Sequence, residues 1–217
     1  MSAAPHQRRK AERPDELLDA ALALFVERGF AATRMDDVAQ RAGVSKGTVY
    51  LYWSAKEELL RAVILRFLGG HLTAGDQAIQ AHDGSASDLL RHLFVDWWIA
   101  IIDSPTSGVF KLMLAEACNF PEIAAFYRQE VVERGQSLIR RIIDKGIADG
   151  EMREVDVEAA VFSLMLPMVM LCVHKHSIGV CAPVEGLQDA PRLIRAHVDL
   201  VLRGLLREPP ADREGPA

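Results

Sequence analysis

The spacing Ala39-x3-Gly43-x5-Val49 is the feature that most narrows the folds open to this chain. It joins two short predicted helices, one ending at Gly43 and one running from Ser45 through Trp53. A helix-turn-helix needs a small residue where the helices touch and a residue that tolerates positive φ in the turn. It also needs an aliphatic residue on the second helix that reaches the shared core. Ala39, Gly43 and Val49 meet these three requirements, so the spacing predicts a helix-turn-helix.

The tetrapeptide Ser-Lys-Gly-Thr at residues 45–48 raises an alternative, a nucleotide phosphate loop. Such a loop needs Gly-Lys-Ser/Thr in that order, a glycine four residues upstream and a preceding strand. Here the order differs and the preceding residues, MDDVAQRAG, favour a helix. The sequence therefore favours contact with the phosphates of a polymer over a nucleotide site.

A helix-turn-helix points the N-terminal end of its second helix into the major groove of DNA. Lys46, Gly47 and Thr48 are then expected to face the nucleic acid, with Gly47 allowing close approach of the backbone. Tyr50 and Tyr52 place hydroxyl groups within reach of backbone phosphates. An ordinary half-buried position for either tyrosine is the alternative.

Helical periodicity continues along the whole chain, and no stretch reads convincingly as a strand. We expect an all-α protein of about nine helices: an N-terminal three-helix head with the helix-turn-helix, then a helical bundle. The predicted divisions are a flexible basic arm (1–13), a DNA-binding domain (14–56), a ligand-binding and dimerisation domain (57–207) and a disordered tail (208–217). A capping box at Ser54–Glu57 is expected to begin the helix after the head.

Charge is distributed unevenly between the two ends of the chain. Residues 1–56 hold nine Lys/Arg and seven Asp/Glu, a net charge of +2, whereas residues 57–217 have a net charge of −7. A basic head on an acidic body indicates a polyanionic partner that the head alone contacts. A soluble charged N-terminus without a partner is the alternative.

No segment suggests secretion or a membrane. The first residues lack an apolar h-region, and the longest apolar run, residues 159–173, is short of a membrane span and interrupted by Pro167. Three cysteines do not form a disulfide framework in a chain of 217 residues. We expect a reduced cytoplasmic protein without a membrane partner.

Residues 33–60, TRMDDVAQRAGVSKGTVYLYWSAKEELL, resemble the DNA-binding head of TetR/AcrR-type transcriptional repressors. The resemblance covers residues 14–64 closely; beyond them only chain length and helix layout match. It implies a homodimer on a palindromic double-stranded DNA operator. It also implies phosphate contacts from Thr33, Tyr50 and Lys56, and groove contacts from Arg34, Ser45, Lys46, Gly47, Thr48 and Tyr52. The sequence departs from the family pattern at Tyr52, where His is more frequent, and at Trp53, where Phe is.

The helix predicted over residues 155–176 is apolar on nearly every side. A helix covered all round suggests a partner subunit on one side and an interior cavity on the other. Together with the last helix it predicts a four-helix dimer interface, with a plain core as the alternative. The candidate interface residues are Val161, Leu164, Val169, Ile194, Val198, Val201 and Leu205.

Bulky adaptable side chains gather in the middle of the body and suit an apolar ligand pocket. The candidates are Trp97, Trp98, Phe110, Met113, Glu116, Met165 and Met168, with ordinary core as the alternative for each. Glu116 is the candidate partner for a cationic or hydroxylated group. Cys172 and His176 share a helix face, but His174 points away, so we predict no metal site and no cofactor.

These features favour a ligand-responsive repressor that a small apolar or amphipathic effector releases from its operator. Two alternatives stay open: a DNA-binding protein without a ligand, and a helical enzyme that uses the body pocket. The sequence offers no nucleophile–base pair or paired carboxylates for the enzyme, and a body without a cavity would favour the protein without a ligand.

Overall fold

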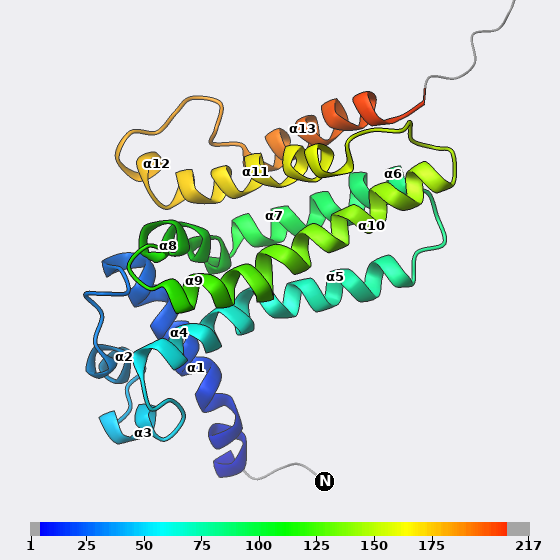
Figure 1. Cartoon of the computed structure of the whole chain (residues 1–217). Coiled ribbons are helices and arrows are strands. Elements are labelled where there is room, and N and C mark those ends of the chain that lie inside the picture. Colours follow the sequence, from blue (N-terminus) through cyan, green and yellow to red (C-terminus); the bar gives the residue numbers. More distant parts are fainter. Residues whose placement is uncertain (1–4, 208–217) are drawn as a thin grey trace, which may run out of the picture.

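The computed structural model describes residues 5–207, with side chains from Arg13 onward. These residues form ten continuous helices and no strand (Figure 1). An isolated antiparallel bridge joins Met152 to Leu206. The prediction of an all-α protein with an N-terminal helix-turn-helix and a helical bundle is therefore confirmed.

The head, residues 13–64, contains the first four helices. They are α1 (Pro5–Arg28), α2 (Met35–Arg41), α3 (Lys46–Tyr50) and α4 (Lys56–Ile64). Leu17, Ala21 and Phe25 of α1 are fully buried against α2 and α4, which gives the head its own apolar core. This core fixes the positions of the two short helices at the lower left of Figure 1.

Helix α1 begins earlier than expected. Its backbone is helical from Pro5, so Pro14 lies inside the helix instead of in its first turn. The residues between the two prolines include Gln, Arg, Lys, Ala and Glu, which are strong helix formers. The expected flexible arm is thus helical from residue 5 to residue 13. Residues 1–4 and the expected disordered tail, 208–217, lie outside the described part of the chain.

The body, residues 65–207, is a stack of longer helices. Several run into one another without a break, including at Gly69–Gly70, where a π-helical segment joins α4 to α5. The segments are η1 (Leu65–Gly69), α5 (Gly70–Gln80), α6 (Ala86–Asp88), η2 (Leu89–Phe94), α7 (Val95–Asp103), η3 (Pro105–Ser107), α8 (Gly108–Glu116), α9 (Pro121–Tyr127), η4 (Arg128–Glu133), α10 (Arg134–Ala148), α11 (Val157–Lys175), α12 (Ile178–Cys181) and α13 (Ala190–Leu205). The short α12 lies between the two long helices α11 and α13.

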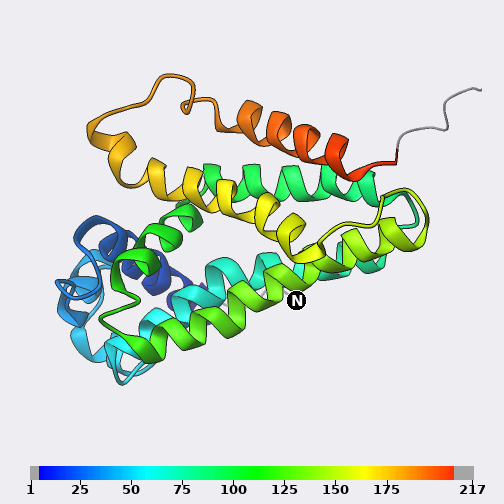
Figure 2. The same ribbon diagram turned by 45° about the horizontal axis from the view of Figure 1, so that its top comes forward.

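The body helices lie in layers. In Figures 1 and 2, α5 and α10 run side by side, α7 lies next to them, and α11 and α13 cover the opposite side. Helix α8 packs against both α1 and α11, so it joins the head to the body. The head and body are also joined by α9, which packs against α4, and by the unbroken helical run from α4 into α5.

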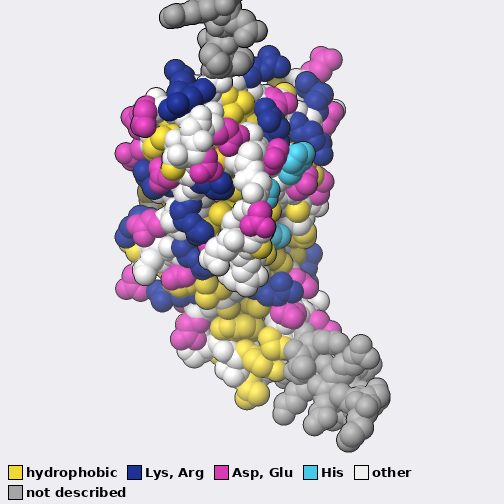
Figure 3. Space-filling model, turned by 90° about the vertical axis from the view of Figure 1, so that its right-hand side faces the viewer, with side chains coloured by type: hydrophobic (Ala, Val, Ile, Leu, Met, Phe, Trp, Pro, Cys, Tyr) yellow, Lys and Arg dark blue, Asp and Glu magenta, His cyan; other side chains and the backbone are white. Residues whose placement is uncertain are grey.

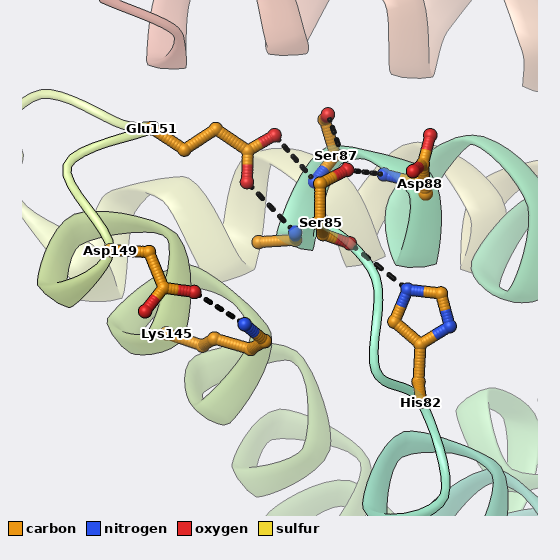
Figure 4. A network of polar contacts seen from close by, with 8 residues as sticks. His82, Ser85, Ser87, Asp88, Lys145, Asp149 and Glu151 are labelled. Carbon is orange, nitrogen blue, oxygen red and sulfur yellow. Dashed lines mark hydrogen bonds and ion pairs between the residues drawn. The ribbon is translucent and has the colours of Figure 1, made fainter.

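At the end of the body farthest from the head, the carboxylate of Glu151 fixes the start of α6. Glu151, in the loop after α10, accepts hydrogen bonds from the backbone N–H groups of Ala86 (2.8 Å) and Ser87 (3.0 Å), as Figure 4 shows. Ser85 caps the same helix start by accepting from the N–H of Asp88 at 3.0 Å. The free amides of this helix terminus are thus satisfied by a negative group, which the helix dipole favours.

On the end of the body seen in Figure 3, Lys/Arg and Asp/Glu side chains are interspersed. Mixed charge of this kind is typical of a solvated surface and does not favour a polyanion. The figure is consistent with the sequence-based expectation that a nucleic acid meets the head and not this end of the body.

Helix α11 is, among the described helices, the one long and apolar enough to span a membrane. Core helices of soluble proteins also pass that test. Here α11 packs against α8, α10 and α13, and Leu164, Met168 and Cys172 are fully buried in the bundle. We therefore read α11 as a bundle helix, although its opposite face is exposed.

Candidate nucleic-acid interface

The turn between α2 and α3 has the geometry that the sequence spacing requires. Gly43 adopts φ +66°, a conformation that glycine reaches without strain. The N–H of Val44 donates to the carbonyl of Ala39 at 2.9 Å, which closes the turn. Ala39 and Val49 are both buried where the two helices meet. The three positions that suggested a helix-turn-helix therefore carry out the three expected roles.

Seven of the nine predicted DNA-contacting residues lie on α3 or beside it and reach the surface. We call these seven the recognition surface: Arg34, Ser45, Lys46, Gly47, Thr48, Tyr50 and Tyr52. Thr48 is half-buried and the other six are exposed. Ser45 has the extended backbone of an N-cap residue, and its hydroxyl lies 2.8 Å from that of Thr48. Helix α3 ends at Tyr50, sooner than the expected end at Trp53.

Lys46 is the charged centre of the recognition surface. Its Nζ donates a hydrogen bond to Oδ2 of Asp36 at 3.1 Å and lies 2.8 Å from Oδ1, and the hydrogen bond to Asp36 raises the pKa of Lys46. Both side chains are largely exposed, and exposed pairs of this kind contribute little to stability. The ammonium also lies 5.7 Å from the centre of the Tyr50 ring. The ammonium of Lys46 is therefore charged, and only a weak ion pair with Asp36 competes with its contact to DNA.

The two tyrosines present their rings to solvent. Tyr50 is 43% exposed and Tyr52 is 37% exposed, whereas Trp53 is half-buried against the core of the head. An exposed tyrosine has an apolar ring and a polar hydroxyl group. It therefore suits contact with a partner that offers both apolar and hydrated polar groups. Trp53 thus packs against the core of the head, unlike the two tyrosines.

Thr33 and Lys56 are placed differently from the expectation. Thr33 is 1% exposed, and its hydroxyl donates to the carbonyl of Gly29 at 2.8 Å. The ammonium of Lys56 donates to the carbonyls of Phe30 (2.7 Å), Ala31 (3.1 Å) and Thr33 (2.9 Å). An ammonium has three N–H donors, and all three are used here. Both side chains thus hold the chain between α1 and α2, and their predicted phosphate contacts stay predictions.

Glu116 is the clearest correction among the predicted pocket residues. It is buried at the end of α8, and its Oε1 accepts from the N–H of Phe30 at 3.0 Å and of Ala31 at 3.4 Å. Its Oε2 accepts from the side-chain amide of Asn119 at 3.3 Å. The carboxylate is thus fully engaged by the protein and does not face a ligand pocket.

Residues 30 and 31 are therefore held from two sides. Lys56 of α4 binds their carbonyl groups, and Glu116 of α8 binds their N–H groups. We call this set, Phe30, Ala31, Lys56 and Glu116, the joint. Burial lowers the pKa of Lys56, and the charges of Glu57 and Glu116 oppose that shift. Through these hydrogen bonds, the joint connects α8 of the body to the chain between α1 and α2 in the head.

The capping box expected at Ser54–Glu57 is shifted by one residue. The N–H and hydroxyl of Ser54 donate to the carboxylate of Glu58, at 2.8 and 2.9 Å, and the N-cap residue is Ala55. These hydrogen bonds lower the pKa of Glu58. The helix start is still fixed by a serine and an acidic residue, as the sequence indicated.

The body contains an apolar cavity in two adjoining chambers. The larger has a volume of about 210 Å³ and the smaller of about 40 Å³. The residues that line both chambers are Leu72, Trp97, Trp98, Gly135 and Met165, and Phe110 lines the larger. Four of the predicted pocket residues therefore lie at a cavity. Met113 is buried core instead, and Met168 borders a separate groove beside Pro167 and His197.

Most of the predicted interface residues face the core of their own subunit in the single chain. Five are fully buried in the single chain: Val161, Leu164, Ile194, Val198 and Leu205. Val201 is half-buried, and Val169 lines the larger chamber. A helix that is apolar all round gives no sequence signal for which stripe faces outward. The apolar side chains that do reach the surface include Leu166 (56% exposed), Met170 (57%) and Leu200 (69%).

The residues considered for metal or thiol chemistry are separated or buried. No group of three or more potential metal ligands occurs among the described residues. Cys172 is buried, which raises the pKa of its thiol to about 12. His176 lies 2.8 Å from the hydroxyl of Ser107, which is fully buried and also donates to the carbonyl of Ser104 at 2.8 Å. This serine–histidine pair joins the end of α11 to η3.

We expect His176 to make the protein less stable in acid. Burial, then the charges of Lys175 and Lys111, lower the pKa of His176, so the folded state binds its proton more weakly than the unfolded state does. The resulting stability is complete above pH 6.5, the ordinary pKa, and is lost as the pH falls through the lower folded-state value. Urea unfolding at pH 7.5, 6.5 and 5.5 measures this loss.

The matched variant is His176→Gln, which keeps a hydrogen-bonding side chain and cannot titrate. It should show a smaller fall in the free energy of unfolding between pH 7.5 and 5.5 than the parent chain. Some loss is expected in both proteins, because burial also lowers the pKa of His71. An identical pH dependence in the two proteins would contradict the role of His176.

The turn, the crossing helices and the exposed recognition surface define a helix-turn-helix DNA-binding protein. Residues 17–63 match the family model for bacterial regulatory proteins of the tetR family. Residues 89–204 match that of the AefR-like transcriptional repressor C-terminal domain. The chain belongs to the TetR family of transcriptional regulators.

Individual relatives agree with this assignment. The HTH-type transcriptional repressor KstR2 of Mycobacterium tuberculosis is 41% identical over 198 residues, covering 90% of this chain and 94% of the relative. Two solved structures share the fold. The fatty acid degradation regulator FadR from Bacillus halodurans has a TM-score of 0.71 at 20% identity, covering 93% of this chain and 97% of its own. A putative transcriptional regulator from Saccharomonospora viridis, in complex with choline, has a TM-score of 0.73 at 19% identity, covering 91% and 100%.

Proposed function

We propose that this chain is a cytoplasmic repressor that binds a palindromic operator as a homodimer and is released by a small, mainly apolar molecule. The observation that carries the proposal is the recognition surface, where Lys46, Tyr50 and Tyr52 are exposed on a helix held by the Gly43 turn. In this proposal residues 14–56 bind DNA, and residues 57–207 bind the effector and form the dimer.

The exposed apolar face of α11 and α13 supports the homodimer. Leu166 and Met170 of α11 and Leu200 of α13 leave large apolar side chains in water. Contiguous apolar surface on a soluble protein is typical of an interface. A second copy of the same face would bury these side chains in a two-fold symmetric contact. A palindromic operator then follows, because two heads related by a two-fold axis read two half-sites.

The cavity and the joint support control by an effector. The chambers lie next to α8 through Phe110, and α8 carries Glu116, which binds the chain between α1 and α2. An effector that favours one position of α8 would change the position of the head. Linkage requires the reciprocal effect, so operator DNA should weaken effector binding by the same factor.

Replacing Lys46 by Ala is expected to weaken binding to DNA from the protein's own promoter by roughly tenfold at low salt, as one positive charge that faces the DNA is lost. The plot of log affinity against log salt concentration should become shallower by about one unit. Fluorescence anisotropy with a labelled promoter fragment over a salt series measures both quantities. Tyr50→Phe, which removes one hydroxyl, should also weaken binding, by a smaller factor.

The matched control is Lys145→Ala. Lys145 is an exposed lysine of α10 that pairs with Asp149 at the far end of the body (Figure 4). Its removal should leave DNA affinity and the salt slope unchanged. Equal affinities for the parent chain and Lys46→Ala at every salt concentration, with unchanged helical content, would refute the assignment of the recognition surface.

A further inference from the structure

Two buried indole N–H groups in the body have no hydrogen-bond partner in the described structure. They belong to the neighbouring residues Trp97 and Trp98, whose ring centres are 4.9 Å apart. Trp98 is only 2% exposed, so bulk solvent reaches little of its ring. Buried polar groups in native proteins are almost always hydrogen-bonded, and leaving one unpaired is unfavourable. Two such groups side by side indicate an acceptor that comes from outside the chain.

Both indoles line both chambers of the apolar cavity described above. Figures 1 and 2 show α5, α7, α10 and α11, which carry most of the lining residues, packed together in the body. The larger chamber, at about 210 Å³, exceeds the roughly 150 Å³ of a dry cavity that accepts a benzene-sized molecule. The space therefore suits a molecule of about two fused rings.

The lining carries no charged side chain. Its polar groups, besides the indoles, are the amide of Gln136 and the phenol of Tyr127. Burial raises the pKa of Tyr127, so the phenol stays neutral. A carboxylate or an ammonium placed here would lose its hydration without gaining an ion pair, which is strongly unfavourable. The cavity thus selects against charged ligands.

An indole N–H donates a hydrogen bond and cannot accept one. A ligand group that meets the two indoles must therefore be an acceptor. On this basis we propose that the cavity binds an uncharged apolar molecule with a carbonyl or similar acceptor oxygen, which the N–H groups of Trp97 and Trp98 recognise. This inference rests on the proposed function, since it names the chemical class of the effector for that cavity.

Three compounds of similar size test the proposal on the full chain by isothermal titration calorimetry. They are 1-tetralone, which has a ketone oxygen, tetralin, which lacks it, and 1-naphthoate, which is charged. We expect 1-tetralone to bind about 5- to 10-fold more tightly than tetralin, as one hydrogen bond to a buried donor provides. We expect 1-naphthoate to bind at least about tenfold more weakly than 1-tetralone.

The variant Trp98→Phe keeps an aromatic ring and removes the N–H donor. In Trp98→Phe, in Trp97→Phe or in both, the preference for 1-tetralone over tetralin should fall to about onefold. The control is Trp53→Phe in the head, which should keep the preference of the parent chain. Circular dichroism and the melting temperature of each variant establish that it is folded.

Three results would overturn the proposal. The first is equal affinity of the parent chain for 1-tetralone and tetralin, as expected if water alone satisfies the indoles. The others are that 1-naphthoate binds most tightly, or that none of the three compounds binds. An unchanged preference in both tryptophan variants would also overturn it. Promoter DNA binding is measured separately on the same samples. Loss of the ligand preference with intact DNA binding refutes only this inference, whereas absence of DNA binding refutes the proposed function and leaves the cavity chemistry standing.

Discussion

Replacing Leu166 by Arg is expected to produce monomers and to reduce affinity for the operator by at least about 100-fold. Leu166 is 56% exposed on the outward face of α11, beside Met170, in the contact proposed for the dimer. A guanidinium buried there without a partner would cost several kcal/mol, which exceeds what a single apolar contact gains. A monomer loses the second head, and joining two binding modules typically raises affinity by about 10²–10⁴-fold.

Sedimentation velocity at micromolar concentration measures the oligomeric state, and anisotropy measures the affinity for promoter DNA. The matched control is Leu114→Arg, because Leu114 is also an exposed leucine (69%) but belongs to α8 and not to α11 or α13. The control should stay dimeric and bind DNA normally. Intact dimers of Leu166→Arg would exclude this face as the interface.

Replacing Glu116 by Ala is expected to lower the free energy of unfolding by about 2–4 kcal/mol. The carboxylate accepts hydrogen bonds from two backbone N–H groups of the chain between α1 and α2 and from Asn119. Its removal leaves the N–H of Phe30 buried without an acceptor, which carries the full cost of its lost hydration. It also removes one of the two negative charges, those of Glu57 and Glu116, that oppose the effect of burial on the pKa of Lys56.

Urea unfolding gives the change in stability, and hydrogen exchange at the Phe30 amide reports whether the joint has opened. Glu116→Gln keeps a carbonyl acceptor and should lose less than half as much stability as Glu116→Ala. The control Glu122→Ala removes an exposed glutamate whose ion pair with Arg61 spans 3.7 Å, and it should change stability by under about 0.5 kcal/mol. If Glu116→Ala were no less stable than this control, the joint would not hold the head to the body.

The helix-turn-helix was predictable because every requirement is local. Ala39, Gly43 and Val49 lie within eleven consecutive residues, and the crossing of two short helices fixes what each position must be. The exposed residues of α3 follow from the same short segment. The boundaries were less predictable: α1 continues through Pro14 toward Pro5, where good helix formers outweigh the proline that suggested a start.

The joint was not predictable because its contacts join residues far apart in the sequence. Glu116 and Phe30 are 86 positions apart, and Lys56 reaches back 26 positions to the carbonyl of the same residue. The sequence signal of Lys56 is that of a lysine at a helix start, which equally suits a phosphate. A family resemblance does not separate these roles, and only the folded geometry shows that its three donors are used.

The outward face of α11 was beyond sequence reasoning for a different reason. Val161 and Leu166 are both aliphatic on the same helix, yet one is buried in the subunit and the other is exposed. Periodicity distinguishes faces only when polar residues mark one of them. Where a helix is apolar on every side, the position of its neighbours decides which stripe is left for a partner.

The joint also bears on how such regulators are recombined in engineering. A DNA-reading segment transplanted onto this body would meet the carboxylate of Glu116, and it would need free backbone N–H groups at the positions of Phe30 and Ala31 that donate hydrogen bonds to it. It would also need its own lysine at the position of Lys56 to hold the opposite side of those peptides. Compatibility between donor and recipient is therefore set by a few atoms where the two parts meet, and a chimera designed with these groups aligned should keep the proposed response to an effector.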